Sequence, residues 1–397
     1  MSGRIPGFTS TGSKRPDALF GPGPDASLPA RMVRSHGCRV WDETGREFTD
    51  YIMGLGAVAL GYGHEAVTTA AQMAVRDGVT GPLPPVLEDE LAQTISRLMP
   101  WVAAMRFLKT GAEALAAAVR LARTHTGRDL VIGCGYHGWL DWCQPAGSAG
   151  VPAGAAVSGM IGFNDVDGGR AMIRAAGDRL AAVVVEPVVL REPAREWLDM
   201  LRGETWSAGA LLIVDEIKTA CRLAVGGATE RYALEPDLVV LGKAIANGFP
   251  LAVVGGRHDV MAATGRTWIS STLATEFVSL AAAHATLGVM TEGRVPEHLA
   301  RVGGRLLAGL RELAARHAPL VSAVGIPEMC FLDLSGDDAS AALARECAAR
   351  GLLFKRSAYN YVSLAHDERT VDATLAVLDE VLSGPGRAGH RGGGRGR

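Results

Sequence analysis

A lysine and an aspartate each stand directly behind an apolar run, at a place where a buried strand would end. Asp215 follows residues 210–214, and Lys243 follows residues 238–241 after a single glycine. Burial there disfavours the ammonium ion, so such a lysine has a lowered pKa and can attack a carbonyl to form an imine. Taken alone, Asp215 fits a helix cap or a magnesium ligand as well.

Together the two side chains indicate one kind of chemistry. Pyridoxal phosphate needs a lysine that holds its aldehyde as an internal aldimine. It also needs a carboxylate that keeps its pyridine nitrogen protonated, so that the ring accepts the electrons left behind by a departing proton. Lys243 and Asp215 match these two requirements. The pattern therefore predicts a pyridoxal-phosphate enzyme that works on an amino group.

A third segment, residues 107–114, runs from a strand-like pattern through Thr110 and Gly111 into an alanine-rich helix. The free backbone N–H groups at such a helix start form an anion site that suits a phosphate. Thr110 acting only as the cap of this helix explains the segment equally well.

A glycine-rich turn, residues 133–138, matches GxGxxG after a strand and resembles a dinucleotide fingerprint. That fingerprint requires a later acidic residue, and none occurs between Asp141 and Asp165, so we reject a nicotinamide dehydrogenase. The aromatic Tyr136 inside the turn is better explained as a plate for a flat ring.

Composition narrows the class of protein. The formal net charge is −2 and 48% of the residues are apolar, which is typical of a globular protein and favours neither nucleic acid nor a membrane as a partner. Neither a membrane span nor a signal peptide is predicted. The six cysteines form no CxxC pair and no zinc spacing, so we expect reduced thiols in a cytoplasmic protein and no metal.

From about residue 65, helical and strand-like periods alternate, which predicts an α/β domain with a mainly parallel sheet. The strand runs are apolar on both faces, so helices should cover both sides of the sheet. Ligands bind at the carboxyl ends of such strands, where the unusual residues stand. The expected strands are 105–109, 130–133, 181–185, 210–214, 238–241 and 252–255, and the expected helices are 88–98, 112–124, 169–175, 277–289 and 295–315.

The chain of 397 residues suits one large domain with a smaller one attached. Two short strands, 38–42 and 48–51, are predicted around a turn in the smaller domain. The Gly- and Arg-rich C-terminal end is expected to be disordered and not to bind nucleic acid. The expected division is an irregular arm over 1–30, small-domain segments over 31–64 and 291–384, a large cofactor-binding domain over 65–290, and the tail over 385–397.

These segments together resemble the class III aminotransferases, which are pyridoxal-phosphate enzymes of fold type I. The resemblance runs from about Ile5 to Leu382 and is greatest to the branch around glutamate-1-semialdehyde aminomutase. It implies a large domain with a mainly parallel, seven-stranded type of sheet between helices and a smaller α/β domain built from both ends of the chain. Further supporting strings are residues 50–56, 185–187, 271–272 and 361–366.

The resemblance also implies a role for each matching residue. Lys243 would form the Schiff base and move the proton, and Asp215 would pair with the pyridinium nitrogen. Tyr136 and Ile217 would pack on the two faces of the ring. Glu186 would orient groups near the ring edge.

Other expected cofactor contacts lie around these residues. Gly111 and Ala112 would offer backbone N–H groups to the phosphate, and His137 would contact the cofactor beside Tyr136. Thr272 would reach the phosphate of the neighbouring subunit's cofactor, which implies a homodimer with a shared active site.

The sequence departs from the family's pattern near the substrate. The phosphate turn has Ala112 where a threonine is usual, so a hydroxyl group is lost. Arg191 falls near the asparagine that reaches the cofactor's phenolic oxygen in the aminomutase. Glu276 stands in a segment that usually reads Ser-Gly-Asn-Pro, and we expect it to face the substrate. These changes predict a substrate different from that of the aminomutase.

We therefore expect an aminotransferase that moves an amino group from a donor such as L-glutamate to a ketone or aldehyde, in specialised or sugar metabolism. An aminomutase and a racemase or epimerase need the same residues and stay open as alternatives. A non-catalytic binding protein would have little reason to keep Lys243 and Asp215. Candidate substrate contacts are Arg222, Glu276, Arg356, Lys355 and His366, and candidate pocket walls are Trp139, Trp142 and Trp268.

Overall fold

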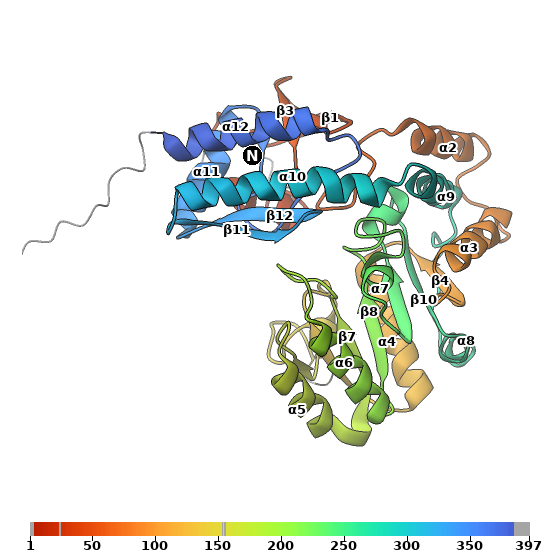
Figure 1. The fold of residues 1–397 in the computed structure, drawn as a ribbon. Coiled ribbons are helices and arrows are strands. Elements are labelled where there is room, and N and C mark those ends of the chain that lie inside the picture. The colour runs from red at the N-terminus through yellow and green to blue at the C-terminus, as the bar shows by residue number, and fades with distance from the viewer. Residues whose placement is uncertain (1–3, 24, 153, 155, 385–397) are drawn as a thin grey trace, which may run out of the picture. The chain divides into compact units, whose positions relative to one another are not determined.

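The computed structural model describes residues 4–23, 25–152, 154 and 156–384, and Figure 1 labels their elements. The chain divides into two units. Among the described residues, the larger comprises Gly56–Leu60 and His64–Glu297, and the smaller comprises those up to Leu55, Gly61–Gly63 and those from His298 onward. Residues 56–60, expected in the small domain, thus belong to the larger unit, which also continues beyond the expected boundary at 290. The expected tail over 385–397 lies outside the described residues.

The larger unit is built on a seven-stranded sheet in the order β4-β10-β9-β8-β7-β5-β6. Strand β10 runs antiparallel to both of its neighbours, β4 and β9, and the other pairs are parallel. The mainly parallel sheet expected from the sequence is confirmed. The strands are β4 Ala104–Leu108, β5 Leu130–Cys134, β6 Gly159–Met160, β7 Leu180–Val185, β8 Leu211–Asp215, β9 Leu238–Leu241 and β10 Ala252–Gly256.

The central strands are buried on both faces because their side chains are apolar at successive positions. Every residue of β7 and β8 is buried. The helix α4 Gly111–Thr126 packs its alanine-rich face against alternate residues of the sheet. The helix α6 Arg195–Ser207, which the sequence reading missed, contacts β7 and β8 and buries Trp197.

The helices predicted in this unit are present, with bounds that differ by a few residues. The further α-helices of the unit are α2 Glu65–Arg76, α3 Val86–Leu98, α5 Val166–Ala176, α7 Gly227–Arg231, α8 His258–Met261 and α9 Phe277–Glu292. The 3-10 turns are η2 Asp141–Cys143, η3 Gly177–Arg179, η4 Lys243–Ala246 and η5 Ala262–Arg266.

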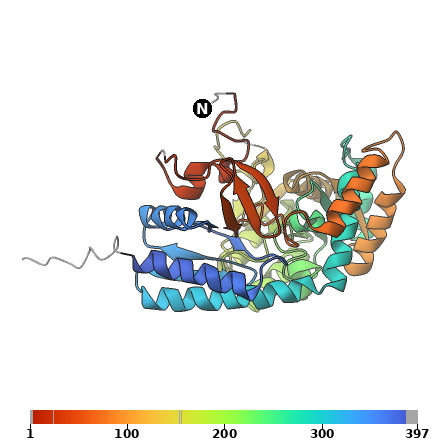
Figure 2. The same cartoon turned by 90° about the horizontal axis from the view of Figure 1, so that it is seen from above.

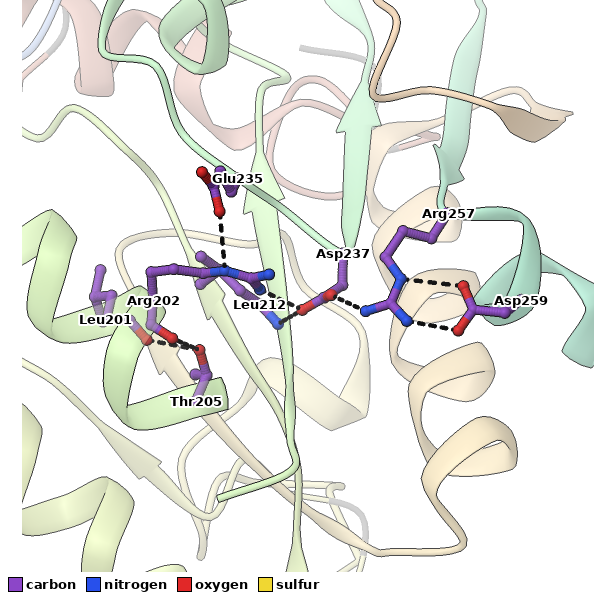
Figure 3. A network of polar contacts seen from close by, with 8 residues as sticks. All are labelled: Leu201, Arg202, Thr205, Leu212, Glu235, Asp237, Arg257 and Asp259. Carbon is purple, nitrogen blue, oxygen red and sulfur yellow. Dashed lines mark hydrogen bonds and ion pairs between the residues drawn. The ribbon is translucent and has the colours of Figure 1, made fainter. Parts of the chain in front are cut away.

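The buried carboxylate of Asp237, directly before β9, is the centre of a network of hydrogen bonds (Figure 3). Asp237 is 1% exposed and accepts hydrogen bonds from the backbone N–H of Leu212 at 2.9 Å, from Arg202 at 3.1 Å and from Arg257 at 2.6 Å. Arg257 also pairs with the exposed Asp259. Since β8 and β9 are parallel, this network lies at the edge of the sheet opposite their carboxyl ends, and it joins Leu212 of β8 to the residue before β9.

The smaller unit contains two short sheets. The first has the order β1-β2-β3-β13 and includes the predicted pair of strands around a turn, and the second has the order β11-β12-β14. The strands are β1 Met32–His36, β2 Arg39–Asp42, β3 Glu47–Asp50, β11 Val321–Ile326, β12 Met329–Leu334, β13 Leu352–Leu353 and β14 Asn360–Tyr361. The helical segments are η1 Gly12–Lys14, α1 Pro16–Phe20, α11 Asp337–Ala349 and α12 Glu368–Ser383, together with α10 Val295–Arg316, which begins just before the boundary.

Helices α10 and α12 run side by side in the smaller unit (Figures 1 and 2). Three ion pairs join them in parallel order: Arg301 with Glu368, Arg305 with Asp372, and Arg316 with Asp379. None of the helices in the described part of the chain is long and apolar enough to cross a membrane.

Candidate active site

Residues that follow β4, β5, β7, β8 and β9 line one cavity of about 690 Å³ within the larger unit. These strands point the same way, so their carboxyl ends meet at one edge of the sheet, where ligands bind in folds of this kind. The lining residues are Ala57, 109–113, Leu115, 136–140, Glu186, Asp215, Ile217, Lys218, Lys243 and 248–251.

Lys243 opens the turn η4 directly behind β9 and lines this cavity. Its φ of 49° lies in the left-handed region, which a residue with a side chain adopts only when its surroundings require it. Burial, followed by the positive charge of Lys218, lowers the pKa of Lys243 from 10.5 to about 8. Near neutral pH, part of the molecules therefore carry the uncharged amine, which is the nucleophilic form.

Asp215 ends β8 and is 3% exposed. Its Oδ2 lies 2.9 Å from Nδ1 of His137, and its Oδ1 accepts a hydrogen bond from the N–H of Ile217 at 3.1 Å. The His137 ring is buried and stacks on Trp142. Among the described residues, Nε2 of His137 has no hydrogen-bond partner. His137 thus lines the cavity as expected, and its polar contact in the structure is with Asp215.

The start of α4 faces the same cavity. Thr110 caps the helix: its hydroxyl accepts from the N–H of Glu113 at 3.2 Å, and the Glu113 carboxylate accepts from the N–H of Thr110 at 2.9 Å. The interpretation of Thr110 as the N-cap of this helix is therefore confirmed. It leaves the N–H groups of Gly111 and Ala112 as the first donors of the helix, so the cap and an anion site are compatible. A Cβ on Gly111 would lie 2.4 Å from Cδ1 of Ile217, so only glycine lets Ile217 pack here.

Glu186 follows β7 and is held at both carboxylate oxygens. Oε2 accepts from the N–H of Tyr136 at 2.9 Å, and Oε1 accepts from Nζ of Lys218 at 2.8 Å. Gly135 allows this contact, because a Cβ there would lie 2.5 Å from Oε2 of Glu186. The sequence reading missed Lys218. Two features of the sequence could have indicated it. Lys218 stands three residues after Asp215, and it is one of only five lysines among 40 lysine and arginine residues.

Two of the three main substrate candidates prove to be structural. Arg222 is fully buried and donates to the carbonyl groups of Gly56 and Val58 at 3.0 and 3.4 Å, so a substrate cannot reach it. Glu276 is the N-cap of α9, and its carboxylate also pairs with Lys109 at 2.7 Å. Neither residue lines the cavity. The structure uses these charges to satisfy backbone groups and a neighbouring lysine, so it gives no support to the predicted substrate contacts.

The other substrate candidates belong to the smaller unit. Arg356 donates to the carbonyl of Ala18 at 3.1 Å and pairs with Asp337 at 2.9 Å, which are structural contacts. Lys355 donates to the carbonyl of Ala358. His366 is fully buried, and burial lowers its pKa to about 3. These contacts lie inside the smaller unit, and the expected substrate contacts of the three residues stay predictions.

Some of the aromatic residues that we expected in the cavity line it, and others do not. Tyr136 and Trp139 line the cavity with largely exposed side chains, whereas Trp142 is buried behind His137. Trp268 is exposed and outside the lining, and so is Thr272. The packing of Tyr136 and Ile217 on a ring, and the reach of Thr272 into a neighbouring subunit, stay predictions.

The cavity fits pyridoxal phosphate. It offers a lysine with a lowered pKa, an oriented carboxylate behind the neighbouring strand, and a helix start whose glycine keeps space for the packing of Ile217. The sheet and this set of residues together define a pyridoxal-phosphate enzyme of fold type I.

Comparison with known proteins leads to the family. The model of the family "Aminotransferase class-III" matches residues 22–149 and 167–367. Glutamate-1-semialdehyde 2,1-aminomutase from a strain of Thermus thermophilus is 34% identical, with 95% of this chain and 96% of that protein covered. The enzyme of the same name from Syntrophobacter fumaroxidans is 33% identical, with 89% and 90% covered. The chain belongs to the class III aminotransferases, whose cofactor is pyridoxal phosphate.

Solved structures agree. The FumI protein of Sphingopyxis sp. MTA144, in its pyridoxal-phosphate internal aldimine form, has a TM-score of 0.85 and 26% identity, with 93% of this chain and 92% of that chain covered. A β-phenylalanine aminotransferase from Variovorax paradoxus has a TM-score of 0.79 and 26% identity, with 91% and 90% covered.

Proposed function

We propose that this protein moves an amino group from one carbon to another at the cavity in its larger unit, with Lys243 as the residue that bonds to the cofactor. The observation that carries the proposal is that Lys243 and Asp215 line one cavity with the start of α4. A non-catalytic binding protein of this fold would not need a lysine with a lowered pKa in the same cavity as an oriented carboxylate.

The residues divide the work between holding and reacting. When bound, pyridoxal phosphate supplies an electron sink for the carbon that loses its proton. The N–H groups of Gly111 and Ala112 would bind its phosphate, and Asp215 would place a negative charge at its ring nitrogen. Lys243 would provide the amine that attacks the cofactor's aldehyde. The Nζ atom of Lys243 would then take up a proton from one carbon and return it to another carbon.

The first candidate reaction is intramolecular, as in a glutamate-1-semialdehyde 2,1-aminomutase. The similarity to two aminomutases at 33–34% identity over most of both chains supports it. In this reaction the same substrate serves as amino donor and amino acceptor, so the site needs no separate donor.

The second candidate is an aminotransferase with a separate amino donor, such as L-glutamate, and a ketone or aldehyde acceptor. The departures near the substrate favour it. Lys218 lines the cavity, and Arg191, which stands near the aminomutase's asparagine, is exposed and outside the lining. The structural similarity to a β-phenylalanine aminotransferase is consistent with such a change of substrate.

An isotope experiment separates the two reactions. The purified protein is first loaded with pyridoxal phosphate, and a visible absorption band that is absent from Lys243→Ala establishes the site. Glutamate-1-semialdehyde is then supplied in the presence of ¹⁵N-glutamate. An unlabelled isomer of the substrate supports the aminomutase, whereas loss of the band with glutamate alone, together with ¹⁵N in the product of an added ketone, supports the aminotransferase. Absence of the band at any cofactor concentration contradicts both.

We also propose a homodimer that works in the cytoplasm. Thr272 is exposed and does not line its own cavity, as expected of a residue that serves a neighbouring subunit. All six cysteines are free, which suits a reducing compartment. Sedimentation tests the dimer. Mixing Lys243→Ala with Thr272→Val subunits tests the shared site, because hybrids that contain one intact site should regain activity that neither parent has.

A further inference from the structure

The cavity holds an unusual share of the chain's lysines. Five lysines occur in a sequence with 40 lysine and arginine residues, and Lys109, Lys218 and Lys243 all line this cavity. Most of the chain's cations are arginines, although Lys14 is an exposed lysine. Lys109 has a structural partner in Glu276, and Lys243 is the reacting residue. Lys218 is the lysine whose part in the reaction has still to be assigned.

The ammonium group of Lys218 is buried and held in place. The residue is 9% exposed, and its Nζ lies 2.8 Å from Oε1 of Glu186. Glu186 is itself held by the N–H of Tyr136 at its other oxygen. A lysine side chain has much conformational entropy, and it is ordered here by a carboxylate that is ordered in turn. Burying a charge costs free energy even when it is paired, so a cation this deeply buried and this well oriented is a candidate for a functional role.

The order of the strands places this cation relative to the cofactor's anchors. Lys243 follows β9, Asp215 follows β8, and Glu186 follows β7, so the ion pair lies on the far side of Asp215 from Lys243 along the sheet. The phosphate turn follows β4, beyond β10 on the opposite side. A pyridoxal ring held at its aldehyde carbon, its nitrogen and its phosphate would turn its remaining edge, which bears the phenolic oxygen, away from the phosphate turn and toward β7.

We propose that Lys218, oriented by Glu186, is the partner of the cofactor's phenolic oxygen and places a fixed positive charge beside the nitrogen of Lys243. The proposal rests on the function proposed above and deepens it by assigning a residue of the same site. The sequence left this partner open, and Arg191, which falls near the aminomutase's asparagine, is exposed and does not line the cavity. An ammonium group is a strong donor to a phenolate oxygen, since both partners are charged.

The fixed charge has a measurable consequence. A cation near the Lys243 nitrogen disfavours a proton on that nitrogen, so Lys218 should lower the pH at which the cofactor's visible band titrates. The lowered pKa of Lys243 in the protein, to which the charge of Lys218 contributes after burial, has the same sign. Other charged or titratable groups line the cavity or lie near this nitrogen, and all of them stay in place in the variants that change Lys218 alone. They are Asp215, Glu186, Arg222, His137, Lys109, Glu113 and Tyr136.

The test is a pH titration of the visible band in the cofactor-loaded full-length protein. Lys218→Met should raise the midpoint by about one pH unit or more and weaken cofactor binding about 10-fold or more, because a charge and a charge-assisted donor are both lost. Lys218→Arg keeps the charge and should stay within about half a unit of the wild type. Lys14→Met, an exposed lysine in the smaller unit, is the matched control and should leave the midpoint unchanged.

A second variant covers the case in which Lys218→Met leaves Glu186 buried without its partner and the protein fails to fold. Lys218→Met with Glu186→Gln removes both charges and should also raise the midpoint, by a smaller amount. A midpoint equal to that of the wild type in the folded single or double variant overturns the assignment of Lys218 and leaves the proposed function intact. A wild-type protein that forms no visible band overturns the proposed function instead.

Discussion

The Nδ1 atom of His137 lies 2.9 Å from Oδ2 of Asp215, and both side chains are almost fully buried. His137 comes from the turn behind β5 and Asp215 ends β8, so the contact passes over β7. Since an ionised carboxylate only accepts, the proton of this hydrogen bond belongs to Nδ1. With the N–H of Ile217 on the other oxygen, the carboxylate is oriented before the cofactor binds.

This relationship predicts a split between two substitutions. His137→Phe keeps a ring beside Trp142 and loses the donor, so the affinity for pyridoxal phosphate should fall about 10- to 100-fold, as expected for a hydrogen bond to a charged group. His137→Asn keeps an N–H near the position of Nδ1 and should retain most of the affinity. Absorbance titration of the apoprotein measures both. Equal affinities would show that ring packing, and not the hydrogen bond, is what matters.

The reacting amine gives the second prediction. Lys243→Ala should lower turnover about 1000-fold or more and remove the visible band, because both the nucleophile and the proton-transferring group are lost. The fold should stay intact, since Lys243 lines a cavity and carries none of the sheet's packing. Thermal unfolding checks that the fold stays intact, and the amino-transfer assay checks the loss of turnover. Lys14→Met is the control, and full activity of Lys243→Ala would end the assignment of the site.

The pKa of Lys243 gives a pH dependence of defined sign. Below about pH 8 most molecules carry the protonated amine, which cannot attack, so the rate at which apoprotein captures pyridoxal phosphate should rise up to tenfold per pH unit and level off above about pH 8. An ordinary lysine, with a pKa of 10.5, would continue to gain rate well beyond that pH. Stopped-flow absorbance from pH 6 upward measures it, and N-acetyl-lysine corrects for the ionisation of the cofactor itself. A rate that still rises steeply past pH 9 would contradict the lowered pKa.

The reacting pair could be predicted from the sequence because local pattern determines where it stands. An apolar run that is buried on both faces must be a strand of this sheet, and the polar residue behind it must lie at the edge where ligands bind. Strands β8 and β9 lie within a residue of their predicted bounds, and Asp215 and Lys243 line the cavity accordingly.

The partners of long side chains could not be predicted in this way. Arg222 bonds to carbonyl groups of residues 56 and 58, and Glu276 bonds to Lys109, across more than 160 positions of sequence in each case. Nothing near either residue in the sequence shows that contact. The same holds for Lys218, whose partner Glu186 lies behind another strand. Charged side chains reach several ångströms from the backbone, so their surroundings depend on tertiary structure.

The packing of Ile217 against the phosphate turn gives the fourth prediction. Gly111→Ala would bring a Cβ to within 2.4 Å of Cδ1 of Ile217, so the isoleucine must move within the cavity, and cofactor affinity should fall about 10-fold. Adding Ile217→Val removes the Cδ1 atom and should restore part of the affinity. Gly203→Ala is the matched control, since a Cβ there meets nothing within 4 Å. No recovery in the double variant would mean that the backbone of Gly111 itself is what the substitution disturbs.

The last prediction concerns stability at the opposite edge of the sheet (Figure 3). Asp237→Ala leaves the N–H of Leu212 buried without its acceptor and takes the shared carboxylate from Arg202 and Arg257, so the free energy of unfolding should fall by about 3 kcal/mol. Asp259→Ala removes an exposed ion pair from the same Arg257 and should cost less than about 1 kcal/mol.

Urea denaturation of both variants, with the slope of the transition compared to the wild type, gives the two free energies. Since Asp237 stands before β9 and Lys243 behind it, Asp237→Ala should lower stability while cofactor affinity, measured well below the denaturation midpoint, stays within about twofold of the wild type. A large loss of affinity in the folded protein would show that the register of β9 depends on the buried carboxylate, and that Lys243 is positioned from both ends of its strand.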